Sequence, residues 1–88
     1  MNIIETKDFA RSLQSLPRST NRLFLVQRSR LKENVRDPRL HLKKLRGLPN
    51  VYSFRITRAF RALFYFQNTN TVVLFDIGDR KDIYRNIE

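Results

Sequence analysis

The sequence predicts an α+β domain, in which an N-terminal strand and a helical hairpin pack on an antiparallel β-sheet meander that a short C-terminal tail follows. Two observations predict this class. Apolar residues recur every three or four positions in the first half of the chain, as on a helix face, and every two positions in the second half, as on a strand face. The 88 residues make one domain, over residues 1–88, and its core is small enough for a covering partner to add to its stability.

The beginning of the chain predicts a strand and a short helix. Asn2–Glu5 is interpreted as the first strand. Thr6 is a suitable N-cap for a helix over Lys7–Ser15, and Pro17 interrupts the helical pattern. Three apolar side chains are spaced four and three positions apart, which places them on one helix face: Phe9, Leu13 and Leu16.

A second, longer helix is predicted over about Ser19–Val35. It ends before Asp37–Pro38, because the residue that precedes a proline avoids the helical region. We expect its apolar residues to form one broad buried face. The shared face consists of Phe24, Leu31 and Val35, and Leu23, Leu25 and Val26 widen it.

The second half of the chain predicts a basic connection and three strands. Residues 38–50 form the connection, which is anchored by Leu40, Leu42, Leu45 and Leu48. Alternating apolar residues then predict strands over Val51–Thr57, Phe60–Gln67 and Thr71–Ile77. We expect Arg80–Glu88 to be a short tail with a helical turn around Tyr84. The helical hairpin covers one face of the sheet, and we expect the second face to stay open.

Two strand registers bear on the chemistry. A turn on Asn68–Thr69 would place Arg61 opposite Asp76, and a turn around Arg58 would place Arg55 opposite Arg61. Opposed residues lie on the same face of a sheet. We therefore expect the two arginines and the aspartate to lie together, on the face away from the apolar side chains of the first of these strands.

The charge of the chain indicates an anionic partner. The chain carries 18 Lys and Arg against 8 Asp and Glu, a formal net charge of +10, and 13 of the cations are Arg. Residues 38–75 contain seven of these cations and no acidic residue. A nucleic acid or an acidic protein segment is the natural partner of such a surface, and a merely basic solvated surface is the alternative.

The residue types that are missing exclude several classes of function. Without Cys, thiol catalysis and Cys-based zinc sites are excluded, and a reducing compartment is favoured. His41 is the one histidine, so no multi-His metal site is possible, and we expect neither metal nor cofactor. His41 is interpreted as a surface or packing residue rather than a catalyst. No targeting segment and no membrane span is recognised, so we expect a cytoplasmic protein without membrane partners.

Four segments of the second half occur in a characteristic order. They read LKKLRGL (42–48), YSFRI (52–56), RALFY (61–65) and FDIGDRKDIYR (75–85). In order and spacing they resemble the signature L-x-G-L … Y-x-x-R-x … Y/F-R-x-x-Y … G-x-R-x-x-x-Y of the RelE/ParE toxin superfamily. The first half of the chain resembles that superfamily only in its strand–helix–helix pattern.

The resemblance implies the toxin of a toxin–antitoxin pair. RelE-like members are ribosome-dependent endoribonucleases (mRNA interferases), which cleave mRNA without metal and so inhibit translation. The partners implied are a cognate acidic antitoxin, mRNA and the ribosome. ParE-like members share the fold but act on DNA gyrase, which is the alternative function. A third possibility is an inactive basic protein that binds RNA or an antitoxin.

Metal-free RNA cleavage needs a group that removes the 2′-OH proton, charge that stabilises the phosphate, and a proton for the leaving oxygen. The resemblance assigns Arg61 to the phosphate in the transition state; an ion pair with Asp76 is the alternative role. Arg80 matches a second phosphate-binding arginine, or is a solvated charge of the tail. Tyr84 matches a tyrosine used for stacking or proton transfer, or packs on the sheet edge.

The catalytic lysines of RelE-like toxins are missing from this chain. Arg55 stands where some of those toxins have a catalytic Lys, and Ser53 stands at the preceding alternate position, where they have another. An arginine almost never acts as a base, so the group that moves the proton is not evident. Lys43 and Lys44, on the flanking basic segment, are candidates to replace these lysines, and charges at the rim that contact a nucleic-acid backbone are the alternative role. Five further cations are interpreted as nucleic-acid contacts or antitoxin docking sites: Lys43, Lys44, Arg46, Arg58 and Arg39.

Overall fold

The computed structural model describes residues 1–83 and confirms the α+β class. The elements in chain order are β1 (Asn2–Glu5), α1 (Lys7–Gln14), α2 (Arg18–Glu33), the 3-10 helix η1 (Pro38–Leu40), β2 (Lys43–Lys44), β3 (Val51–Arg55), β4 (Phe60–Asn68), β5 (Thr71–Asp79) and α3 (Arg80–Ile83). They form one five-stranded sheet of order β1-β5-β4-β3-β2. β1 is parallel to β5, and the other neighbours are antiparallel, so the predicted meander is framed by an N-terminal strand on one edge and a two-residue strand on the other.

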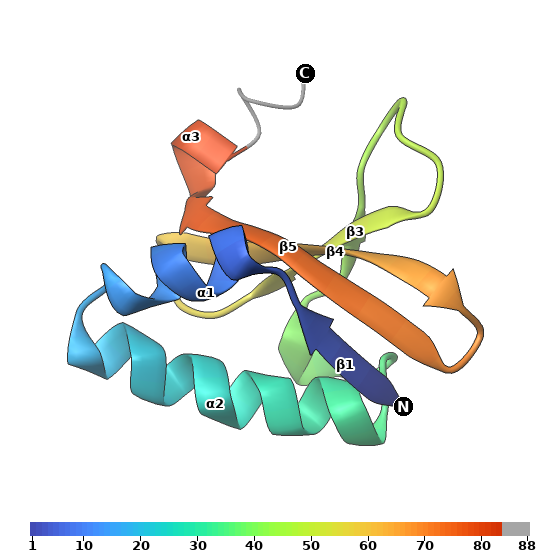
Figure 1. Ribbon diagram of the computed structural model, residues 1–88, viewed down its shortest axis with the longest axis horizontal. Helices are drawn as coiled ribbons and strands as arrows, with labels where there is room; N and C mark the ends of the chain where they lie inside the picture. The colour runs from blue at the N-terminus through green and yellow to red at the C-terminus, as the bar shows by residue number, and fades with distance from the viewer. Residues whose placement is uncertain (84–88) are drawn as a thin grey trace.

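The main core lies between the sheet and the helical hairpin. Figure 1 shows α1 and α2 on one side of the sheet, which we call the first face, and α3 on the other side, the second face. The first face buries alternate residues of β3, β4 and β5 against the helices. The fully buried aromatic side chains of this core are Phe9, Phe24, Phe54 and Phe64. The predicted cap of α1 is confirmed, because Thr6 Oγ1 accepts a hydrogen bond of 3.1 Å from the N–H of Phe9.

The prediction of a broad buried face on α2 is wrong. Phe24 and Leu31 are buried as expected, together with Thr20 and Gln27. Each residue turns a helix by about 100°, so residues next to Phe24 or two positions from it point away from the core. Three predicted members of the face are accordingly exposed by about half: Leu23 (47%), Leu25 (60%) and Val26 (44%). Within residues 1–83, neither α2 nor any other helix combines the length and apolarity needed to cross a membrane.

The register of β4 and β5 corrects the predicted pair of Arg61 and Asp76. Asn68 pairs with Thr71, so the chain turns one residue later than expected. Two register shifts, between Phe66 and Asn68 and between Leu63 and Phe64, offset one another, so the register set by the turn is regained at Leu63. Arg61 therefore lies opposite Gly78, and Asp76 lies opposite Leu63. In contrast, the predicted pair of Arg55 and Arg61 is confirmed.

The second face is not open throughout. Leu63 is fully buried in a small cluster with Leu45, which precedes the turn at Gly47, and Ile83 of α3. Partly buried side chains surround this cluster: Leu48, Val51 and Phe75. The connection after β2 and the first turn of the tail thus cover part of the sheet, and the charged residues of the second face lie beside this covered part.

Candidate nucleic-acid interface

The strand registers bring three predicted site residues together on the second face. Because paired residues share a face, Lys43, Ser53, Leu63 and Asp76 form one row across β2, β3, β4 and β5. Arg55 and Arg61 form the adjacent row with Gly78. Lys43, Arg55 and Arg61 therefore come from three different strands but occupy neighbouring positions. This group is the centre of a cationic surface suited to phosphate.

Arg61 is the most constrained of these cations. Arg61 is only 6% exposed, and its Nε donates to Ser53 Oγ at 3.0 Å. Its Nη2 donates to the main-chain oxygen of His41 at 2.6 Å and to that of Ser53 at 3.4 Å. The guanidinium therefore joins β4 to β3 and to the segment that leads into β2. Ser53 is itself fully buried and accepts two of these bonds, one at its hydroxyl and one at its main-chain oxygen, so it is part of the support for Arg61.

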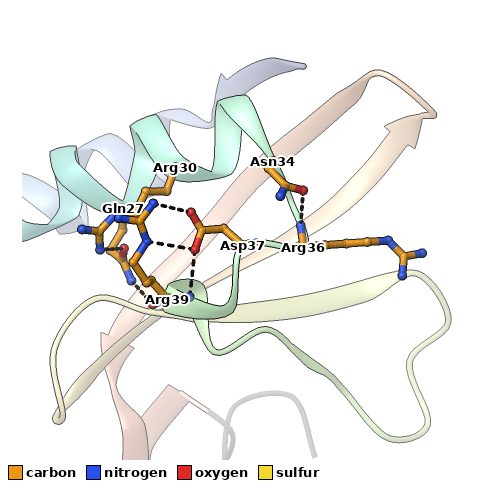
Figure 2. A network of polar contacts seen from close by, with 6 residues as sticks. All are labelled: Gln27, Arg30, Asn34, Arg36, Asp37 and Arg39. Carbon is orange, nitrogen blue, oxygen red and sulfur yellow. Dashed lines mark hydrogen bonds and ion pairs between the residues drawn. The ribbon is translucent and has the colours of Figure 1, made fainter.

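The segment before β2 is held from the opposite side by α2. The buried Gln27 amide donates to the main-chain oxygens of Arg39, at 2.9 Å, and of Arg55, at 2.6 Å. Arg30 Nη1 donates to Gln27 Oε1 at 2.9 Å, which orients the amide, as Figure 2 shows. One side chain of the helical hairpin thus joins the main chain of Arg39, before β2, to that of Arg55, at the end of β3.

Asp37 organises the start of η1. Its Oδ1 accepts from the N–H of Arg39 at 2.9 Å, and its two oxygens accept from Nε and Nη2 of the same arginine at 3.0 and 2.8 Å (Figure 2). The side-chain hydrogen bonds from Arg39, and next the main-chain one, lower the pKa of Asp37 from 3.8 to about 2. Arg39, a predicted nucleic-acid contact, is therefore engaged within the protein although it is exposed.

This lowered pKa predicts an acid-dependent contribution to stability. Since the pKa is lower in the folded state, ionised Asp37 stabilises the protein fully above about pH 4, and the contribution is lost as the pH falls toward 2. Asp37→Asn is expected to unfold at lower urea than wild type at pH 6, with the gap closing near pH 2. Asp8→Asn is the control, because Asp8 and its partner Arg11 are both highly exposed and 3.9 Å apart. A gap of equal size at both pH values would contradict the assignment.

The remaining predicted cations fall into two groups. Arg58 and Arg80 lie at the end of the sheet near the Arg55 row: Arg58 is in the turn between β3 and β4, and the N–H of Arg80 donates to the oxygen of Ala59 in that turn. Lys44 pairs with Tyr52, whose side chain belongs to the first face, so its position is on that face rather than with Lys43. Arg46 is exposed beside the turn at Gly47. Tyr84 lies outside the described residues.

Asp76 is the carboxylate of the second-face rows. Burial raises its pKa above the ordinary 3.8, and a hydrogen bond of 2.9 Å from the N–H of Ile77 lowers it by less. Its place opposite Leu63 does not support the predicted role as the direct partner of Arg61. Among residues 1–83, no three His, Asp or Glu side chains come together in a way that could hold a metal ion.

Comparison with known proteins defines the class of fold. No protein-family model and no curated protein sequence matches the chain. Among solved structures, however, the chain has the fold of RelE-like toxins, as its sequence motifs predicted. It superposes on the RelB–RelE antitoxin–toxin complex from Methanococcus jannaschii with a TM-score of 0.79 and 20% identity, over 97% of this chain and 99% of that chain.

Two further structures show the breadth of this likeness. The RelE–RelB complex from Pyrococcus horikoshii OT3 gives a TM-score of 0.75 at 22% identity, covering 92% of this chain and 96% of that one. The YoeB/ParE toxin from Agrobacterium tumefaciens gives 0.77 at 13% identity, covering 91% and 99%. At these identities the likeness is one of fold, and the chemistry has to be argued from the residues of this chain.

Proposed function

We propose that the chain is the toxin of a toxin–antitoxin pair and inhibits translation as a ribosome-dependent endoribonuclease. The observation that carries the proposal is the opposed pair of Arg55 and Arg61 on the second face, with Lys43 in the neighbouring row. A cleaving enzyme without metal must hold one phosphate against fixed positive charge, and strands fix such charges better than loops do. The net charge of +10 supports attraction to RNA over long range.

The cognate antitoxin is proposed as an acidic, amphipathic protein segment. The similar RelE structures from M. jannaschii and P. horikoshii are complexes with RelB. In this chain, α2 carries exposed apolar side chains at Leu23, Leu25 and Val26, and five of its residues are Lys or Arg against one Glu. A partner helix with its own apolar stripe and acidic flanks fits such a surface. The proposed target and partner both place the protein in the cytoplasm.

Induced expression tests the ribonuclease directly. We expect wild-type expression to arrest growth and to produce discrete cleavage sites in translated mRNA, mapped by primer extension. Arg55→Ala is expected to reduce cleavage at least tenfold, because Arg55 supplies charge to the site without a buried structural role for its guanidinium. Arg18→Ala is the matched control: it removes the same charge from an exposed position on α2 and should leave arrest intact. Arrest with intact mRNA would contradict the ribonuclease.

Inhibition of DNA gyrase is a second candidate, and one observation favours it. Ser53 and Arg55 replace two lysines that RelE-like ribonucleases use, and Ser53 is fully buried, so it is not available to a substrate. Growth arrest with intact mRNA and a loss of supercoiling by purified gyrase would establish this candidate. Expression without arrest would favour the third possibility, an inactive protein that binds RNA or its antitoxin.

A further inference from the structure

We propose that His41 is the proton acceptor of the site, and removes the proton of the attacking 2′-OH of RNA. This inference rests on the ribonuclease proposed above. The sequence assigned His41 to the surface or to packing; in the structure it is exposed, and its main-chain oxygen contacts the cationic group through Arg61. The carbonyl of His41 is 2.6 Å from Nη2 of Arg61, which lies opposite Arg55.

The main chain at His41 is unusual and is held in place. His41 has φ 47° and ψ 51°, the left-handed region, which a histidine adopts less readily than glycine or asparagine. Its N–H donates to the oxygen of Pro38 at 3.2 Å, and its oxygen accepts from Arg61. Gln27 holds Arg39, two residues earlier, and Arg55 through their main-chain oxygens. His41 is the C-cap of η1, a place where a left-handed residue is common, and the bonds on both sides of it hold the main chain in this position.

The pairing of β2 with β3 shows which residues His41 lies beside. Lys43 pairs with Ser53 at the start of β2, and the strands are antiparallel, so the chain before Lys43 lies toward Arg55. The Gln27 amide, which binds the main-chain oxygens of both Arg39 and Arg55, supports this placement. His41 is exposed at this point, next to the row that contains Arg55 and Arg61. A phosphate bound by these arginines would bring the adjacent ribose to the rim of the row. His41, an exposed residue, therefore lies at the edge of the proposed phosphate site, with its main chain in contact with the buried residue Arg61.

Tyr84, which the sequence offers for proton transfer, lies outside the described residues, and Lys43 is a cation near neutral pH, as lysines ordinarily are. Imidazole is the side chain that changes its charge between pH 5 and 8, so it is suited to proton transfer near neutrality. Arginine is unsuited to this role, and Ser53 is buried against Arg61. The charged groups on the elements packed around His41 are Arg30, Asp37, Arg39, Lys43, Arg55 and Arg61, and the carboxylate of Asp37 is bound to Arg39.

The proposed step conserves atoms and charge. As the 2′-oxygen forms its bond to phosphorus, its proton passes to a ring nitrogen of neutral His41. The bond between phosphorus and the 5′-oxygen breaks, and the departing 5′-oxygen takes a proton from water. The products are a 2′,3′-cyclic phosphate and a 5′-hydroxyl, and the imidazolium then returns its proton to solvent. Arg55 and Arg61 stabilise the charge on the phosphate during this step.

Two substitutions at the same position separate proton transfer from backbone support. His41→Asn and His41→Gly both tolerate the left-handed conformation, so both should fold with urea midpoints at or above that of wild type. Cleavage is measured with purified protein and mRNA-programmed ribosomes. We expect both variants to cleave about 100-fold more slowly, the lower end of what a positioned base contributes. The wild-type rate should rise with pH below neutrality, and the His41→Asn rate should not.

Chemical rescue makes the test specific. We expect added imidazole to restore a large part of the cleavage by His41→Gly, because glycine leaves room for a free base, and to leave His41→Asn unchanged. The proposal would be overturned by variants that cleave at the wild-type rate. Slow variants that imidazole does not restore, and whose rate keeps the wild-type pH dependence, would also overturn it. A wild-type protein that cleaves no RNA would contradict the proposed function itself, a distinct outcome.

Discussion

Phe64→Ala is expected to lower the free energy of unfolding by about 3–5 kcal/mol, the cost of removing a large aromatic side chain from a core. Phe64 is fully buried in the middle of β4. Its ring centre lies 5.6 Å from that of Tyr52, 6.1 Å from that of Phe54 and 5.6 Å from that of Phe66. Alanine would leave a cavity and remove three ring contacts. Since domains are stable by about 5–15 kcal/mol, urea unfolding followed by circular dichroism should show a protein close to unfolded.

The next residue on the strand supplies the control. Tyr65 points to the second face, is 39% exposed, and makes one ring contact with Phe75 at 5.7 Å. Tyr65→Ala removes a ring of similar size from the same strand, and should cost less than half as much. Equal losses would show that the core between sheet and helices is not the main source of stability. Side chains of β4 thus point alternately to the first and the second face, and this alternation is also the reason that the strand could be predicted from sequence.

The elements could be predicted because each depends on local patterns. Thr6 caps α1 through a bond three residues away, and the strands follow a period of two. β2 was missed because two residues carry no measurable alternation. The pairing of β4 with β5 was predicted with its turn one residue too early, because the polar residues from Asn68 to Asn70 suit either turn. The two register shifts in this pair offset one another, so the displaced turn alone moves Arg61 from Asp76 to Gly78.

The exposed apolar residues of α2 show a different limit. Leu23, Leu25 and Val26 are next to buried residues in sequence, so a broad face was a reasonable expectation, but α1 and the sheet cover only the side that carries Phe24 and Leu31. The apolar pattern of a helix predicts the direction in which each side chain points. It does not predict how much of the helix the rest of the protein covers. The surplus apolar surface is where the proposed antitoxin adds most to the stability of the domain.

The sequence predicted which residues belong to the candidate site, but not the hydrogen bonds that join them. Arg55 and Arg61 were placed opposite each other because hairpin pairing follows from the length of the turn. The bonds from Arg61 to His41 and from Gln27 to Arg39 and Arg55 could not be predicted, because their acceptors are main-chain carbonyls, which every residue has. The one signal in the sequence was His41, a lone histidine among cations. Its place beside the site became evident only from the structure, which gave its backbone conformation.

Arg61→Ala is expected to abolish growth arrest and also to destabilise the fold, by about 3–5 kcal/mol. Each hydrogen bond from a charged donor contributes about 1.5–3 kcal/mol, and the alanine would leave the buried Ser53 hydroxyl without this donor and the His41 carbonyl without its anchor. Arg61→Lys keeps the charge but cannot present two donors in a fixed fork, so it should recover only part of the stability. Urea unfolding of both variants measures this loss.

Comparison with Arg55→Ala then separates the role of Arg61 in binding phosphate from its role in supporting the fold. Arg55 lies opposite Arg61, and its guanidinium is not part of the buried link, so its loss should reduce cleavage with little change in the urea midpoint. If Arg61→Ala unfolds at the same urea concentration as wild type, the bonds to Ser53 and His41 do not support the fold, and Arg61 acts on the phosphate alone. If it is strongly destabilised while Arg55→Ala is not, Arg61 holds the site in position for Arg55 and His41. We expect the second result, because Arg61 is only 6% exposed and donates to Ser53 and to the main chain of His41, so that its loss disturbs the fold as well as the phosphate site.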